Sequence, residues 1–181
     1  MTYIGQYQSP LGGITISGSG DEITGLWFDG QKYFGAGLPQ TYENKELPVF
    51  AEARRWLDLY FSGQAPDFTP PLRMETTAFR KAVWEILLTI PFGQTTTYGR
   101  IAEKMAAHKG FAKMSARAVG GAVGHNAISL MIPCHRVIGA NGSLTGYAGG
   151  MERKVWLLTM EKAATAGEAA EGIFCAPVQN A

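Results

Sequence analysis

The sequence contains few cysteines and histidines and no long hydrophobic run. Among its 181 residues there are two cysteines and three histidines, and no spacing between them fits a zinc site, so we predict no metal. No apolar stretch is long enough to cross a bilayer, and the first residues lack the basic patch and apolar core of a signal peptide. We expect a cytoplasmic protein without a membrane partner, in a reducing compartment where Cys134 and Cys175 stay unpaired.

Charge is uneven along the chain. The formal net charge is +1, but residues 1–71 carry −4, residues 72–162 carry +7 and residues 163–181 carry −2. A basic segment after an acidic one favours a polyanionic partner for the second part. The alternative on charge alone is a basic face that contacts only solvent.

The first part of the chain has the pattern of β structure followed by a helix. Apolar and polar residues alternate over 13–18 and 23–28, which predicts a β-hairpin. Apolar residues then recur at helical spacing over 48–61. The proline-rich stretch 66–71 cannot continue this helix and predicts a domain boundary, so we expect a first domain over 1–71.

The second part has the pattern of several helices. Thr77, Thr97 and Ser115 each precede an apolar-periodic stretch and can cap a helix. The last two of these helices are short and consecutive, which favours a helix-turn-helix, although periodicity alone does not separate this from another helical domain. We expect this domain to span 72–162, followed by a loosely ordered tail over 163–181.

A cysteine beside a histidine is the main chemical signal. Cys134 lies among apolar residues and is followed by His135 and Arg136. Apolar surroundings make a thiol inert, whereas a neighbouring base or cation favours the thiolate. Pro133 restricts the backbone just before the thiol. The tripeptide alone is compatible with a nucleophile and with a core strand that holds an inert cysteine.

Four other features are ambiguous when taken singly. Gly120-Gly121 costs roughly 0.5–1 kcal/mol per glycine inside a helix, which suits either close approach to DNA beside Arg117 or tight packing between helices. Asn126 could cap that helix, Tyr147 could be a packing residue, and Glu161 could be a solvated charge.

Taken in order, the motifs are more specific. They are Thr97-Tyr98-Gly99, Ala116-Arg117-Ala118-Val119-Gly120-Gly121-Ala122, Asn126, Ile132-Pro133-Cys134-His135-Arg136-Val137, Gly146-Tyr147-Ala148-Gly149-Gly150, and Trp156-Leu157-Leu158 followed by Glu161. This set closely resembles the O6-alkylguanine-DNA alkyltransferases, also called methylated-DNA–protein-cysteine methyltransferases. The resemblance covers residues 75–162 well and the first domain more weakly.

The resemblance implies an α/β (α+β) fold. It implies an N-terminal ribonuclease-H-like domain and a C-terminal winged-helix-like, mostly helical DNA-binding domain. The implied activity is direct-reversal DNA repair: a single-turnover, irreversible transfer of a methyl or other alkyl group from O6-alkylguanine, and from O4-methylthymine, to Cys134 without a cofactor. The implied partner is double-stranded DNA, bound through the minor groove by a monomer.

The resemblance also implies roles for single residues. Cys134 would accept the alkyl group, His135 would take its proton through a water, and Glu161 would orient the histidine. Asn126 would brace the active-site loop. Tyr98 would crowd the target phosphate and supply a proton to the guanine ring.

Further residues would bind the DNA and the flipped base. Arg117 would fill the gap left by that base, on a surface shared with Thr97, Tyr98, Ala118, Gly120 and Gly121. The Val137 carbonyl would accept a hydrogen bond from the guanine amino group. Tyr147, Met131 and Pro133 would line the substrate pocket.

Two features depart from the family pattern. Ala127 stands where a proline usually follows the loop asparagine, which is expected to loosen the loop. The segment over 108–114 is longer than in many members, and its Lys109 and Lys113 could contact phosphates or be solvated.

Two other functions are compatible with parts of the pattern. A non-enzymatic damage-binding relative would lack the cysteine, so Cys134 counts against it. A cysteine hydrolase would need an oxyanion hole, an Asn or Asp partner for the histidine, and turnover.

Overall fold

The structure is a computed structural model that describes residues 1–108, 110–111 and 114–163. It contains two compact units, one formed by Met1–Thr76 with Ala127–Met131, the other by Thr77–Asn126 with the described residues from Ile132 onward. The first unit therefore extends to Thr76, beyond the domain boundary that we expected after residue 71. The chain beyond it still belongs to the first unit because Arg73 donates its backbone N–H to the Ile23 carbonyl at 2.8 Å.

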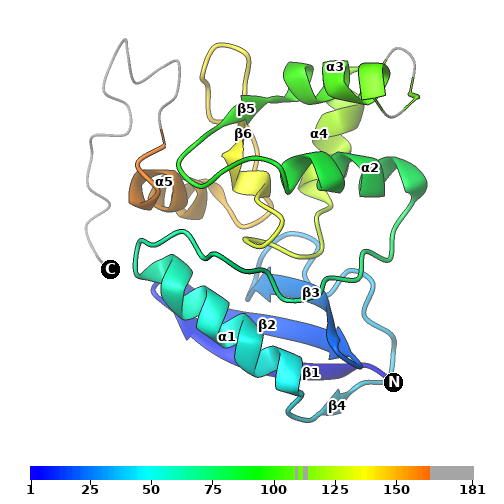
Figure 1. The fold of residues 1–181 in the computed structure, drawn as a ribbon, viewed down its shortest axis with the longest axis vertical. Helices are drawn as coiled ribbons and strands as arrows, with labels where there is room; N and C mark the ends of the chain where they lie inside the picture. The colour runs from blue at the N-terminus through cyan, green and yellow to red at the C-terminus, as the bar shows by residue number, and fades with distance from the viewer. Residues whose placement is uncertain (109, 112–113, 164–181) are drawn as a thin grey trace. The chain divides into compact units, whose positions relative to one another are not determined.

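The first unit is a four-stranded sheet with one helix (Figure 1). Strands β1 (Tyr3–Ser9), β2 (Gly12–Ser19) and β3 (Glu22–Phe28) are antiparallel, and β4 (Glu43–Asn44) pairs parallel to β1. The strand order is β3-β2-β1-β4. The predicted hairpin is confirmed as β2 and β3.

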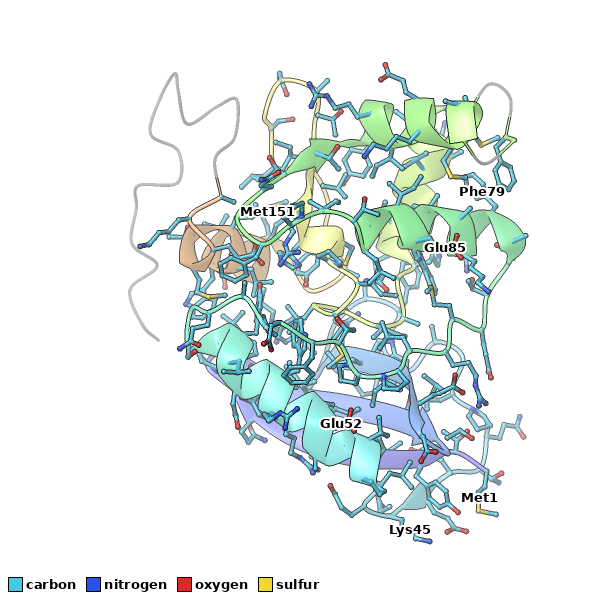
Figure 2. All side chains as sticks on the ribbon, viewed as in Figure 1. Met1, Lys45, Glu52, Phe79, Glu85 and Met151 are labelled. Carbon is cyan, nitrogen blue, oxygen red and sulfur yellow. The ribbon has the colours of Figure 1, made fainter. Side chains whose placement is uncertain are left out.

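Helix α1 (Pro48–Phe61) confirms the predicted helix and its apolar face. Its buried residues are Val49, Phe50, Ala53, Trp56, Leu57 and Tyr60, whereas Glu52 is exposed (Figure 2). The helix contacts the sheet closely at two glycines, since a Cβ on Gly5 or Gly18 would lie 2.9 or 2.8 Å from the Phe50 ring. These glycines allow the aromatic ring to pack directly on the strands.

The segment Ala127–Met131 adds a short pairing to β3 within the first unit. The Leu26 N–H donates to the Ala127 carbonyl at 2.8 Å, and the Ser129 N–H donates to the Leu26 carbonyl at 2.9 Å. Leu130 then has a φ of 69°, and the Met131 N–H closes a three-residue turn to the Ser129 carbonyl at 2.8 Å. The sequence did not predict this pairing, because five residues without alternation carry no strand signal.

The second unit is mostly helical. It contains α2 (Ala78–Leu87), β5 (Thr96–Thr97), α3 (Tyr98–His108), α4 (Ala116–Gly124), a 3₁₀ turn η1 (Cys134–Arg136), β6 (Val137–Ile138) and α5 (Met151–Met160). Helices α2, α3 and α4 pack against one another. The Trp84 indole N–H donates to the Ala122 carbonyl at 2.8 Å, and Phe79 (Figure 2) meets Phe111 edge to face at 5.6 Å.

The three predicted helix caps are confirmed. The Thr77 hydroxyl accepts from the Arg80 N–H at 3.2 Å, Thr97 accepts from Arg100 at 3.2 Å, and Ser115 accepts from Ala118 at 3.1 Å. Each cap satisfies one of the backbone donors that a helix start leaves unpaired. The sequence therefore located the starts of α2, α3 and α4.

The end of the second unit differs slightly from the expectation. Ala163, placed in the tail by the sequence, is buried beside Ile138 and Leu158. The rest of the expected tail, with Cys175, lies outside the described residues, as do Lys109 and Lys113 of the longer segment. None of the helices in the described part of the chain is long and apolar enough to cross a membrane.

Candidate active site

Two tight turns position Cys134. Pro133 has φ −80° and ψ 65°, and the Cys134 N–H closes a three-residue turn to the Ile132 carbonyl at 2.8 Å. Cys134 then starts η1, from which the chain enters β6. The thiol is therefore on a 3₁₀ turn and not on a core strand, and Cys134 is only 4% exposed.

Asn126 fastens the loop that leads to the cysteine. Its Nδ2 donates to the Ile132 carbonyl at 2.7 Å, and its side chain also hydrogen-bonds Cys134. The residue that caps α4 is His125, so the capping interpretation of Asn126 is wrong. Because Asn126 bonds both sides of Pro133, it fixes the turn before the thiol.

His135 and Glu161 form a buried pair. The His135 Nε2 lies 2.8 Å from Glu161 Oε1, and both side chains are fully buried. The interpretation of Glu161 as a solvated charge is wrong. A carboxylate at Nε2 selects the neutral tautomer with its proton there, so that Nδ1, which is also buried, is the basic nitrogen.

Arg136 joins this pair, and the sequence did not predict its role. Its Nε lies 3.2 and 3.0 Å from the two Glu161 oxygens, and Nη2 lies 2.9 Å from Oε1. Burial raises the pKa of Glu161, but the hydrogen bonds and charges of His135 and Arg136 outweigh it and hold the pKa well below its usual range. Glu161 therefore stays ionised.

Lys154 is a second charged residue that the sequence analysis missed. It is fully buried, and its ammonium donates to the carbonyls of Val137, Thr145 and Gly146 at 2.7, 2.9 and 3.1 Å. Burial lowers the pKa of Lys154 to about 8, against the opposing effect of Cys134. Lys154 thus links α5 to β6 and to the segment 145–150, which we call the glycine-rich loop.

The site stabilises a neutral resting pair of thiol and imidazole. Burial raises the pKa of Cys134, although the Asn126 hydrogen bond, the Lys154 charge and two backbone N–H groups lower it in part. Burial lowers the pKa of His135; Glu161 raises it, while Arg136 and Lys154 lower it further. The proton therefore stays on sulfur until another group favours the thiolate.

Two tyrosines lie near the sulfur. The Tyr147 hydroxyl is buried and its ring meets the His135 ring edge to face at 6.4 Å. The Tyr98 hydroxyl, from the first residue of α3, donates to the Thr145 carbonyl at 3.2 Å. Burial raises the pKa of both phenols, and the proximity of Cys134 raises it too. Both tyrosines are therefore protonated at neutral pH.

Helix α4 presents small residues and one cation. Arg117, Ala118 and Gly121 are exposed, and Gly120 is half-buried. A Cβ on Gly121 would meet nothing within 4 Å in the described part of the chain, and one on Gly120 would make only ordinary contact with the Tyr98 ring at 3.8 Å. Tight packing between helices does not explain these glycines.

The structure brings most of the predicted site residues into the second unit. These are Cys134, His135, Glu161, Tyr98, Asn126, Tyr147, Val137 and Pro133, with Thr97, Arg117, Ala118, Gly120 and Gly121 on α3, α4 and the strand before them. Met131, predicted to line the pocket, is buried in the first unit. Among the described residues, no group of three or more histidine, cysteine or acidic side chains could hold a metal ion.

Comparison with known proteins identifies both parts of the chain. Residues 78–163 match the family model of the 6-O-methylguanine DNA methyltransferase DNA-binding domain, and residues 2–74 match its ribonuclease-like domain. The mixed α/β class and the ribonuclease-like and DNA-binding parts predicted from the sequence are thereby confirmed.

Curated relatives and solved structures agree with the family models. A methylated-DNA–protein-cysteine methyltransferase from Haemophilus influenzae is 42% identical over 161 residues, which cover 88% of this chain and 86% of the relative. One from Mycobacterium tuberculosis is 43% identical over 85% and 88% of the two chains. The crystal structure of the Mycobacterium tuberculosis OGT in complex with DNA has a TM-score of 0.77 at 41% identity, over 88% and 92% of the two chains. The chain belongs to the 6-O-methylguanine DNA methyltransferase family, the O6-alkylguanine-DNA alkyltransferases that its motifs resemble.

Proposed function

We propose that this protein repairs DNA by direct reversal, moving an alkyl group from O6 of guanine to the sulfur of Cys134. The observation that carries this proposal is the buried Cys134–His135–Glu161 arrangement in a chain of this family. A nucleophile beside a base, with a third group that orients the base, is what activation of a weak nucleophile requires.

The residues of the site account for each proton and each bond in the transfer. The thiol proton passes to Nδ1 of His135, directly or through a water, while Glu161 stabilises the imidazolium at Nε2. The thiolate attacks the alkyl carbon as the bond between that carbon and O6 breaks. Guanine leaves as a neutral base because it receives a proton, for which the protonated Tyr98 is the donor. The thioether has no leaving group, so each molecule reacts once.

Contact with DNA is assigned to α3 and α4. The exposed Arg117 on a glycine-bearing helix suits entry into the minor groove and insertion where the alkylated base has been extruded. Thr97, Tyr98, Ala118, Gly120 and Gly121 would share this surface. A weakly paired alkylated base costs less to extrude than a normal one. We propose that a monomer performs the reaction.

Intact-protein mass spectrometry tests the proposal. The protein is mixed with duplex DNA carrying one O6-methylguanine, and a second mixture carries O4-methylthymine. We expect a gain of one methyl group per molecule, with no further gain when DNA is in excess. Binding without a mass change would instead support a damage-binding protein, and catalytic turnover would support a hydrolase.

The acceptor is tested with Cys134→Ala. This variant should transfer nothing but bind methylated duplex DNA within about threefold of the wild type, because the removed sulfur is buried and α4 is untouched. Cys175→Ala, at the other cysteine, is the control and should keep full transfer. Methylation of the Cys134→Ala protein would contradict the assignment.

A further inference from the structure

The carboxylate of Glu161 occupies an electrostatically unfavourable position. Glu161 is the C-terminal cap of α5 and is 3% exposed. The C-terminus of a helix carries partial negative charge, so an acidic group there is destabilised, and burial adds a desolvation cost. A carboxylate in this place needs a fixed cation.

Arg136 supplies that cation in a rigid arrangement. Its Nε and Nη2 hold both oxygens of Glu161, and Nη1 donates to the Ile90 carbonyl at 2.7 Å. Glu161 Oε2 also accepts from the Gly93 N–H at 3.3 Å. The guanidinium fork thereby fixes the plane of the carboxylate, which a lysine could not do with one point charge.

The arrangement has a consequence for the histidine. With Arg136 present, His135 faces a neutral ion pair; without it, His135 would face a bare buried carboxylate, which favours uptake of a proton by the pair. The groups that face the site from each packed element are Cys134 and Arg136 on η1, Glu161 and Lys154 on α5, Tyr147 on the glycine-rich loop, and Tyr98 on α3 next to Cys134. Of these, only Glu161 attracts a proton to His135 at neutral pH.

We propose that Arg136 is a positioning residue for alkyl transfer: by clamping Glu161 it keeps the His135–Glu161 pair free of an extra proton in the resting protein, so that His135 is ready to accept the proton of Cys134. The proposal rests on the proposed function. It extends the Cys134–His135–Glu161 arrangement by a residue whose guanidinium contacts Glu161 and the Ile90 carbonyl.

The pH dependence of the transfer rate shows whether the His135–Glu161 pair holds an extra proton in the resting protein. In the wild type, the resting state (thiol, neutral histidine) and the reactive state (thiolate, imidazolium) hold the same number of protons, so the transfer rate is independent of pH near neutrality. If the pair already holds a proton, the reactive state has one proton fewer than the resting state. The rate must then rise about tenfold per pH unit until the cysteine–histidine pair has lost this extra proton.

The test combines NMR titration of the His135 ring with single-turnover transfer between about pH 6 and 8, in the full chain. For Arg136→Met we expect a protonated His135 ring near neutral pH and a rate that rises with pH. The double variant Arg136→Met with Glu161→Gln should return His135 to the neutral form. Arg153→Met removes a cation elsewhere on α5 and should leave the His135 titration unchanged.

A conservative variant separates charge from geometry. Arg136→Lys keeps the charge and should keep His135 neutral, but it should slow transfer several-fold at every pH because Glu161 is no longer held at both oxygens. If Arg136→Met does not fold, this variant still tests the proposal: protonation of His135 in Arg136→Lys would overturn it. A neutral His135 and a flat pH profile in a folded Arg136→Met would also overturn it. Failure of the wild type to transfer would refute the proposed function alone, since the NMR titration reads Arg136 without transfer.

Discussion

At the scale of single residues, the site depends on buried charges. Lys154, Glu161 and Arg136 lie in the interior of the second unit, and each has fixed partners. Lys154 donates to three backbone carbonyls, and Arg136 and Glu161 form an ion pair with each other. Removing one partner of a buried pair leaves an uncompensated charge, which is costly. We therefore expect the residues that prepare Cys134 to be important for stability as well as for reactivity.

Glu161→Gln should lower the free energy of unfolding by about 3–5 kcal/mol at pH 7, because Arg136 is left buried without its carboxylate. The pKa of Glu161 in the folded protein is below the unfolded value of 4.5. Its contribution is therefore complete above about pH 4.5 and is lost as the pH falls toward the folded pKa. Urea unfolding at stepped pH values should show the difference between wild type and variant shrinking below that pH.

The control is Glu103→Gln, at an exposed position on α3, which should change stability by less than about 0.5 kcal/mol. A difference for Glu161→Gln that stayed constant down to pH 3 would contradict the ionised, clamped state of Glu161.

The sequence predicted the reacting residues but not the charges that support them. Cys134, His135 and Glu161 came from motif order, whereas Lys154 was passed over although it lies on the buried stripe of α5. Lys154, Leu157, Leu158 and Glu161 follow helical spacing and are all buried. A charge on an apolar stripe was a usable signal; the bidentate contact of Arg136 was not, because it depends on a carboxylate 25 residues away.

At the scale of elements, α4 has a composition that lowers its own stability. Gly121 lies in the helix, and no residue that the structure describes comes within 4 Å of a Cβ placed on it. Gly121→Ala should therefore raise the free energy of unfolding by roughly 0.5–1 kcal/mol. The same variant should bind duplex DNA more weakly, because the added methyl group stands where a groove would approach. Thermal unfolding and a DNA titration measure the two effects.

Gly93→Ala is the matched comparison for stability. Gly93 has a φ of 80°, and a Cβ there would lie 3.1 Å from the Glu161 carbonyl oxygen, so this variant should be less stable. If Gly121→Ala also lost stability, α4 would have neighbours that the structure does not show.

Two substrates distinguish the role of Arg117 on α4 in base extrusion from the role of His135 in activating the thiol. Arg117→Ala should slow methyl transfer from duplex DNA at least about tenfold more than transfer from free O6-benzylguanine, because only duplex DNA requires an extruded base to be replaced. His135→Ala should slow both reactions, since it acts on the thiol. Single-turnover rates on both substrates decide the point. Equal losses for Arg117→Ala would mean that Arg117 supports the active site and not base extrusion.

Local signals explain which elements could be predicted. A single residue, Thr or Ser, marks the start of each of α2, α3 and α4, and the apolar residues of α1 recur at helical spacing over its 14 residues. The pairing of Ala127–Met131 with β3 depends instead on a partner about 100 residues earlier in the chain. Such a contact has no local periodicity, so no pattern in the sequence predicts it.

At the scale of the whole molecule, charge is divided between the two parts of the chain. Residues 72–162 carry +7 and residues 1–71 carry −4. Affinity for duplex DNA should therefore fall on the order of tenfold or more between about 50 and 200 mM salt, as counterions are displaced by the basic part. Arg100→Gln on α3 should reduce the salt slope by about one, whereas Arg55→Gln on α1 should leave it unchanged. An affinity independent of salt would show that the basic part does not face phosphates.

The pairing of Ala127–Met131 with β3 also limits how this protein can be recombined. The first unit is encoded by two separate stretches, 1–76 and 127–131. A gene fragment for 1–76 alone would specify a sheet whose Leu26 N–H and carbonyl lack the partners that Ala127 and Ser129 provide. A chimaera between relatives made with a single crossover near residue 76 would join a sheet from one parent to an edge segment from the other. A single crossover near residue 76 therefore cannot transfer this unit whole from one parent to the other, and a second exchange that covers 127–131 is needed.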